Sequence, residues 1–127
     1  MKDTRFIQGR INSFKYAFNG ARKLIFTEHS IMVQAFIAMA TVIAGFYFNI
    51  SATEWMLQIL ATGVVLSIEG LNTAVEKIAD FIHPEYNERI GFIKDIAAGS
   101  VVFASLAALA IGIIIYSPKI LIVFTAR

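Results

Sequence analysis

Ser67-Ile-Glu-Gly-Leu-Asn-Thr-Ala-Val-Glu-Lys-Ile-Ala-Asp80 is the stretch that dictates how the rest of this sequence folds. It continues an uncharged apolar run that starts at Trp55, so it reads as the end of a membrane-spanning helix. At about 100° per residue, one arc of about 100° holds its polar side chains: Glu69, Asn72, Thr73, Glu76 and Asp80. Carboxylates at membrane depth are costly, so this stripe must face protein, a metal ion or a water-filled cavity.

The composition indicates one membrane-embedded domain over residues 1–127. Hydrophobic residues make up 57% of the chain, whereas about 45–50% is usual for a soluble domain. The absence of cysteine excludes disulfides, Cys-ligated zinc and a thiol nucleophile. The two histidines are too few for a His-based metal cage.

An N-terminal amphipathic helix is predicted over residues 4–26. Its apolar side chains recur every three or four residues, the spacing of one helical face: Ile7, Ile11, Phe14, Phe18, Ala21 and Ile25. Basic residues lie off this face, as is typical of a helix in the lipid headgroup region. The alternative is a helix packed on the domain with its other face in water.

Three transmembrane helices are predicted, at about 31–49, 54–82 and 92–116. The first and third follow from long uncharged runs. The second measures about 42 Å, longer than the roughly 30 Å hydrocarbon core, and it ends before Pro84. Residues 118–127 are expected to form a short tail at the interface.

The distribution of basic residues predicts the orientation. Of the 11 Lys and Arg residues, only Lys119 and Arg127 follow the third span, and the other nine precede the first span or flank the loop at 83–93. The positive-inside rule therefore places the N-terminus and this loop in the cytoplasm.

The cytoplasmic ends of the three spans bring carboxylates and a lysine to one depth. Glu69 lies about 21 Å along its helix from Trp55, inside the hydrocarbon, and suits a general base for a hydroxyl arriving from the membrane. Glu28 and Glu76 lie nearer the water and suit Mg²⁺, which bridges phosphates, while Lys94 suits phosphate. Neither a GxxxxGK[ST] loop nor a kinase-type glycine loop is present, so ordinary nucleotide-binding folds are excluded.

The motif Glu69-x-x-Asn72-x-x-x-Glu76-x-x-x-Asp80, followed by Lys94-Asp95-x-x-x-Gly99, resembles the prokaryotic diacylglycerol kinase family, which includes undecaprenol kinases. Glu28 and the stretch 13–20 add to the likeness. The resemblance implies an all-α homotrimer of three-span subunits with an N-terminal surface helix, in the bacterial inner membrane. It implies active sites shared between subunits and transfer of the γ-phosphate of MgATP to a lipid hydroxyl. The acceptor is diacylglycerol, giving phosphatidic acid, or undecaprenol, and no nucleic acid is expected as a partner.

The same resemblance assigns roles to single residues. Glu69 corresponds to the catalytic base, Asn72 and Asp80 to groups that shape the site, and Glu28 and Glu76 to the metal-binding pair. The implied nucleotide contacts are Tyr16, Glu85, Tyr86, Asn87, Lys94 and Asp95. Asn87 stands where some members carry histidine.

Other interpretations of these residues stay open at this point. The acidic stripe also suits a proton or ion relay, and a non-catalytic assembly subunit would tolerate changes of carboxylate to amide. Glu69 and Glu76 are alternatively partners of Lys77 or Lys94 in ion pairs between helices. Lys94 and Asp95 are alternatively an interfacial anchor, and Asp80, Glu85 and Glu88 a solvated helix end and loop. Gln34 and Gln58 are expected to form hydrogen bonds between helices.

Overall fold

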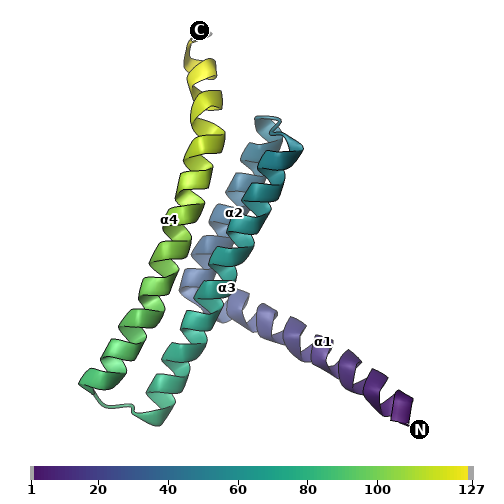
Figure 1. Cartoon of the computed structure of the whole chain (residues 1–127), viewed down its shortest axis with the longest axis vertical. Helices are drawn as coiled ribbons and strands as arrows, with labels where there is room; N and C mark the ends of the chain where they lie inside the picture. The colour runs from purple at the N-terminus through teal and green to yellow at the C-terminus, as the bar shows by residue number, and fades with distance from the viewer. Residues whose placement is uncertain (1, 126–127) are drawn as a thin grey trace.

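The computed structural model describes residues 2–125, with side chains from residue 5 onward, and its regular structure consists of four helices. These are α1 (Lys2–Thr27), α2 (His29–Tyr47), α3 (Ala52–Ile82) and α4 (Glu88–Thr125). Helices α2, α3 and α4 lie side by side, and α1 leaves this bundle at a steep angle (Figure 1). Each of the three bundled helices is long and apolar enough to cross a membrane. The predicted all-α fold with three membrane-spanning helices is therefore confirmed.

Helix α1 projects from the bundle instead of packing along it (Figure 1). Its apolar face is exposed, and among residues 5–27 only Leu24, near its end, is partly buried. Leu24 Cδ1 lies 3.2 Å from the point where a Cβ on Gly70 of α3 would stand, so the missing side chain of Gly70 makes room for it. An uncovered apolar face is what a helix in the headgroup region requires, and the placement of α1 in that region stays a prediction.

Helix α4 is longer than the span predicted over 92–116. It begins at Glu88 because Asn87 caps it: the Asn87 Oδ1 accepts hydrogen bonds from the backbone N–H of Arg89 (3.0 Å) and Ile90 (3.3 Å). It also continues through Pro118 to Thr125, so the prediction of a separate tail is wrong up to that residue. Residues 126 and 127, including Arg127, lie outside the described part of the chain.

An ion pair with α3 stabilises the part of α4 that follows Pro118. Lys119 Nζ lies 2.6 Å from Glu54 Oε1 at the start of α3. The Oε2 of the same carboxylate accepts the Ser51 N–H at 2.7 Å, and Ser51 Oγ accepts the Glu54 N–H at 3.3 Å, which completes a capping box. Glu54 therefore caps α3 and holds α4 against it at once.

The turn between α2 and α3 is tightly packed. Asn49 has a φ of 49°, a left-handed conformation that asparagine tolerates better than most residues. Trp55 lies against Gly45, where a Cβ would stand 2.6 Å from the Trp55 Cη2 atom. The Phe46 and Trp55 rings also meet, with centroids 5.0 Å apart. Gly45 thus allows α2 to approach the start of α3 closely.

A hydrogen-bonded polar group ties the three spans together in the half of the bundle near this turn. Gln58 is only 7% exposed, and its Nε2 donates to the Thr41 carbonyl on α2 at 3.1 Å. The Tyr116 hydroxyl on α4 lies 2.5 Å from Gln58 Oε1 and 3.0 Å from the same carbonyl, so its one proton serves two acceptors. The prediction of interhelical hydrogen bonding is confirmed for Gln58. Gln34 Oε1, in contrast, is buried without a partner among the described residues.

Replacing Gly45 by alanine should destabilise the protein by about 1–3 kcal/mol, because the new methyl group overlaps the Trp55 ring. Unfolding in detergent micelles, followed by circular dichroism, measures this change. Gly9→Ala is the control, since a Cβ at Gly9 meets nothing within 4 Å. Equal stability of the two variants would show that Trp55 does not need the space at Gly45.

Candidate active site

The polar stripe of α3 faces α4. Glu69, Asn72 and Thr73 are buried, Glu76 is half-buried and Asp80 is exposed. A cavity of about 380 Å³ lies between the two helices, with Glu69 and Asn72 on its α3 wall. Its α4 wall consists mainly of apolar side chains: Ala98, Val101, Val102, Ser105, Leu106 and Leu109. The structure therefore brings the predicted base and its neighbouring amide into one apolar cavity.

Some hydrogen-bond acceptors of this stripe have no partner in the described part of the chain. Asn72 Nδ2 donates to Glu76 Oε1 at 3.2 Å, which fixes the amide. Asn72 Oδ1 is buried with no hydrogen-bond partner among residues 5–125. The residue Glu69 is 6% exposed, and its carboxylate has no hydrogen bond to another side chain or to the backbone within the same range. Buried polar groups in native proteins are normally paired, so the unpaired Asn72 Oδ1 beside Glu69 indicates a place for a ligand.

A second, larger cleft of about 650 Å³ lies farther from the α3–α4 loop, between α2, α3 and α4. Its walls are mostly apolar and include Gln34, Gln58 and Tyr116. Ser105 and Leu109 belong to the walls of both spaces, so the cavity at Glu69 adjoins this cleft. The carboxylate thus lies beside an apolar space, a setting that suits a hydroxyl at the end of a hydrocarbon chain.

An ion pair joins the end of the stripe to α4. Lys94 Nζ lies 2.9 Å from Asp80 Oδ1, across the loop that connects the two helices. The lysine is about one-third exposed and the aspartate about two-thirds exposed. The prediction that Asp80 and Lys94 lie at one end of the site is met by this contact, and it fixes the position of a cation near Glu76.

Glu28 is the single non-helical residue between α1 and α2. Its Oε1 lies 3.0 Å from Lys77 Nζ on α3 and accepts a hydrogen bond from Thr27 Oγ1 at 3.1 Å. These two contacts, Lys77 first, hold the pKa of the Glu28 carboxyl below its usual value. Glu28 is therefore ionised at neutral pH, as a metal ligand must be.

The alternative that Glu69 and Glu76 form ion pairs with Lys77 or Lys94 is wrong for a single chain, because both lysines pair with other carboxylates. Lys77 pairs with Glu28 and Lys94 pairs with Asp80, so neither reaches Glu69 or Glu76 as an ion pair. Sequence reasoning missed the role of Lys77. Its only signal is its place one residue after Glu76, about 100° around the helix and so toward a different neighbour.

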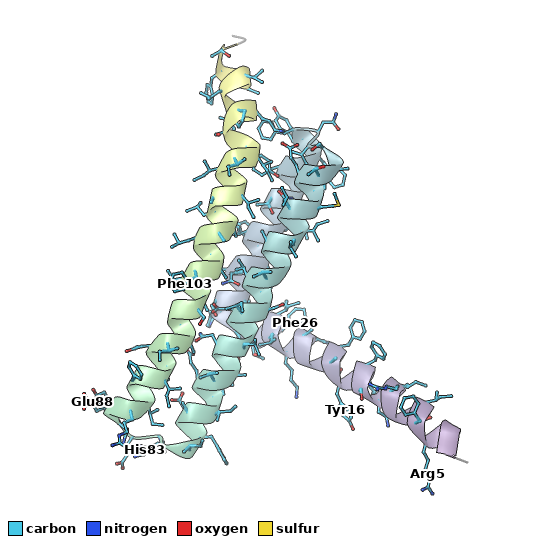
Figure 2. All side chains as sticks on the ribbon, viewed as in Figure 1. Arg5, Tyr16, Phe26, His83, Glu88 and Phe103 are labelled. Atoms are coloured by element: carbon cyan, nitrogen blue, oxygen red, sulfur yellow. The ribbon has the colours of Figure 1, made fainter. Side chains whose placement is uncertain are left out.

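The remaining predicted residues lie outside this cluster in a single chain. Tyr16 projects from the middle of α1. It lies far from the α3–α4 loop, which His83 and Glu88 mark in Figure 2. In the loop, Glu85 and Tyr86 are exposed, and Asn87 serves as the cap of α4. Asp95 is exposed on α4. One chain therefore gathers Glu69, Asn72, Glu76, Asp80 and Lys94, but not Tyr16.

Carboxylates, the ligands that a hard divalent cation prefers, are present on α3 and at the α1–α2 junction. Residues 5–125 contain no group of three or more His, Asp or Glu side chains placed to hold a metal ion. Mg²⁺ usually takes only one or two carboxylates and completes its shell with water and phosphate oxygens. Glu28, ionised beside the bundle, and Glu76, held by Asn72, are carboxylates of that kind.

Comparison with known proteins identifies relatives over most of the chain. The sequence model of a family described as prokaryotic diacylglycerol kinase matches residues 15–116. An undecaprenol kinase of Bacillus subtilis (strain 168) is 35% identical over 108 residues, which is 85% of this chain and 88% of that protein. Diacylglycerol kinases of Haemophilus influenzae and Synechocystis are 32% identical over 94 residues and 30% identical over 110 residues. The alignments cover 74% and 86% of this chain and 80% and 63% of those proteins, respectively.

Two buried polar residues of α3 should respond differently to substitution. Gln58→Leu should lower the free energy of unfolding by about 1–3 kcal/mol, because it leaves the Thr41 and Tyr116 groups without their partner. Glu69→Gln should not lower it, since the carboxylate has no protein partner to lose and the substitution removes a charge from a buried position. Unfolding in detergent measures both, and a large loss for Glu69→Gln would mean that the carboxylate has a structural role.

Proposed function

Because the chain belongs to the prokaryotic diacylglycerol kinase family and is therefore a membrane lipid kinase, we propose that it transfers the γ-phosphate of MgATP to the primary hydroxyl of a membrane lipid. The observation that carries the proposal is the Glu69 carboxylate, which has no protein partner among residues 5–125 and lies with the unpaired Asn72 Oδ1 on the wall of an apolar cavity between α3 and α4. A hydroxyl carried on a hydrocarbon chain reaches such a cavity from the membrane.

The proposed chemical step uses Glu69 as the general base. Its carboxylate accepts the proton of the lipid hydroxyl while the lipid oxygen forms a bond to the γ-phosphorus. The bond from that phosphorus to the β–γ bridging oxygen breaks, and ADP leaves. Asn72 lies beside Glu69, and its buried Oδ1 is free to accept a hydrogen bond from the incoming group. The products are the lipid phosphate and ADP.

The remaining residues bind the phosphates in this proposal. Glu28 and Glu76 hold Mg²⁺, which when bound neutralises charge on the β- and γ-phosphates. Lys94 contacts phosphate, and Asp80 positions Lys94 through the 2.9 Å contact. The proposed nucleotide contacts are Tyr16, Glu85, Tyr86, Asn87 and Asp95.

We further propose that the enzyme works as a homotrimer in the bacterial inner membrane, with its N-terminus in the cytoplasm. Nine basic residues at the proposed cytoplasmic side support this orientation. Within one chain, Tyr16 on α1 lies far from the loop at 83–87 (Figure 2). This separation supports a site shared between subunits, in which Tyr16 of one chain contacts the nucleotide at the loop of its neighbour.

Undecaprenol is the acceptor that we propose, with diacylglycerol as the alternative. The relative named undecaprenol kinase has a higher identity to this chain, 35%, than the two named diacylglycerol kinases at 32% and 30%. Both lipids carry one primary hydroxyl at headgroup depth, so the same base serves either of them.

Purified protein should transfer label from [γ-³²P]ATP to undecaprenol faster than to diacylglycerol when both lipids are offered in micelles with Mg²⁺. Thin-layer chromatography separates undecaprenyl phosphate from phosphatidic acid. Preferential labelling of phosphatidic acid would show that diacylglycerol is the acceptor and would leave the proposed kinase activity in place. Labelling of neither lipid, with active protein from a relative as the positive control, would contradict the proposed reaction.

Glu69→Gln should reduce lipid phosphorylation by at least about 10²-fold, the lower end of the contribution expected from a general base. Glu88→Gln is a matched control, because Glu88 is an exposed acid at the start of α4 and has no place in the proposed site. Initial rates at saturating ATP and lipid give the comparison. Turnover of Glu69→Gln equal to that of Glu88→Gln would remove Glu69 as the base.

A further inference from the structure

Glu28 occupies an N-cap position but does not cap its helix. Its backbone is extended, with φ −106° and ψ 114°, and its side chain makes no capping hydrogen bond to α2. A carboxylate at this position would ordinarily accept from the first free N–H groups of the helix. Here it turns to Lys77 of α3 at 3.0 Å instead. The direction of the Glu28 carboxylate is therefore set by Lys77 of another helix, together with the neighbouring Thr27 hydroxyl.

We propose that Lys77 is a positioning residue that holds Glu28 in the metal-free enzyme and gives it up when the divalent cation binds. This inference rests on the proposed function, because it takes Glu28 as a ligand of that cation. Lys77 neighbours Glu76, the second proposed ligand, along the chain. The lysine is the cation that compensates for the charge of Glu28 until a metal ion arrives.

Distances explain why the two cations compete. Lys77 Nζ lies 3.0 Å from Glu28 Oε1, and Mg²⁺ binds carboxylate oxygen at about 2.0–2.1 Å. If both cations shared this carboxylate, they would stand only about 5 Å apart, and their repulsion at that separation is considerable even in water. The Lys77 side chain is 67% exposed and flexible, so it moves away more easily than the half-buried Glu76 or the helix junction at Glu28.

The exchange also affects the junction between α1 and α2. Glu28 is the non-helical residue at that junction, and Lys77 connects it to α3. The other contact of α1 with α3 named above is Leu24 against Gly70, next to Glu69. When Lys77 is released, the contact of Leu24 with Gly70 still joins α1 to α3 beside Glu69. The junction at Glu28 is no longer joined to α3 by the ion pair.

Titration with Mn²⁺, with free ion counted by electron paramagnetic resonance, tests the competition without relying on activity. Lys77→Met should bind Mn²⁺ about three- to tenfold more tightly than the wild type, because the repelling charge is removed. Lys77→Arg should bind as weakly as the wild type or more weakly, since it keeps both charge and donor. Lys119→Met is the control: it breaks the comparable 2.6 Å pair with Glu54 at the opposite end of the bundle and should leave affinity unchanged.

The outcomes separate this inference from the proposed function. If Lys77→Met binds Mn²⁺ no more tightly than the wild type while Glu28→Gln loses binding, Glu28 is a ligand but Lys77 does not compete for it, and the inference fails. If Glu28→Gln keeps wild-type Mn²⁺ affinity, the metal role of Glu28 fails, and the inference fails with it.

A second measurement uses the unmodified protein and so does not depend on the folding of a variant. Mass spectrometry after brief acetylation reports the reactivity of each lysine amine. Mg²⁺ should raise the modification of Lys77, because the amine leaves its carboxylate partner, and should leave that of Lys119 unchanged. Equal modification of Lys77 with and without Mg²⁺ would overturn the exchange.

Discussion

The cost of placing polar groups inside an apolar three-helix bundle governs this structure. A charged side chain at the centre of a bilayer costs about 2.5–3.5 kcal/mol on insertion scales, so each polar group there needs a reason. In the half near the α2–α3 turn, Gln58, Tyr116 and the Thr41 carbonyl satisfy one another and join three helices. In the other half, Glu69 and Asn72 Oδ1 have no such partner in the described chain. The first group stabilises the bundle, and the second is available for chemistry.

Close approach of the helices makes this division possible. Gly45 lets Trp55 lie against α2, and Gly70 lets Leu24 of α1 reach α3 next to Glu69. The pair of Glu54 with Lys119 holds α4 to α3 at the end opposite the site. The cavity at Glu69 is thus bounded by helices whose far ends are fixed, while α3 and α4 continue past the α1–α2 junction to their own loop (Figure 1).

The sequence predicted the features that depend on periodicity and missed those that depend on packing. The stripe on α3 and the interhelical role of Gln58 follow from helical spacing and from the cost of polar groups in lipid. The end of α4 could not be predicted in this way. A proline usually ends a helix, whereas α4 continues past Pro118, with Lys119 paired to Glu54. The partner of Glu28 was also missed. Which lysine reaches it depends on how α2 packs on α3, and composition does not specify that packing.

The ion pairs around the site are partly exposed, and their weakness makes it easy for the side chains to exchange partners. The pairs of Glu28 with Lys77 and of Asp80 with Lys94 are both partly exposed, and exposed ion pairs contribute at most about 1 kcal/mol. Weak pairs of this kind keep the side chains compensated without opposing the arrival of a more highly charged ligand. In the proposed reaction, a nucleotide with its metal ion brings both signs of charge, so each lysine and each carboxylate of these pairs gains a new partner when its old one is released. Glu69, in contrast, has no ion-pair partner among residues 5–125, so in the proposed reaction it accepts a proton without first releasing a lysine.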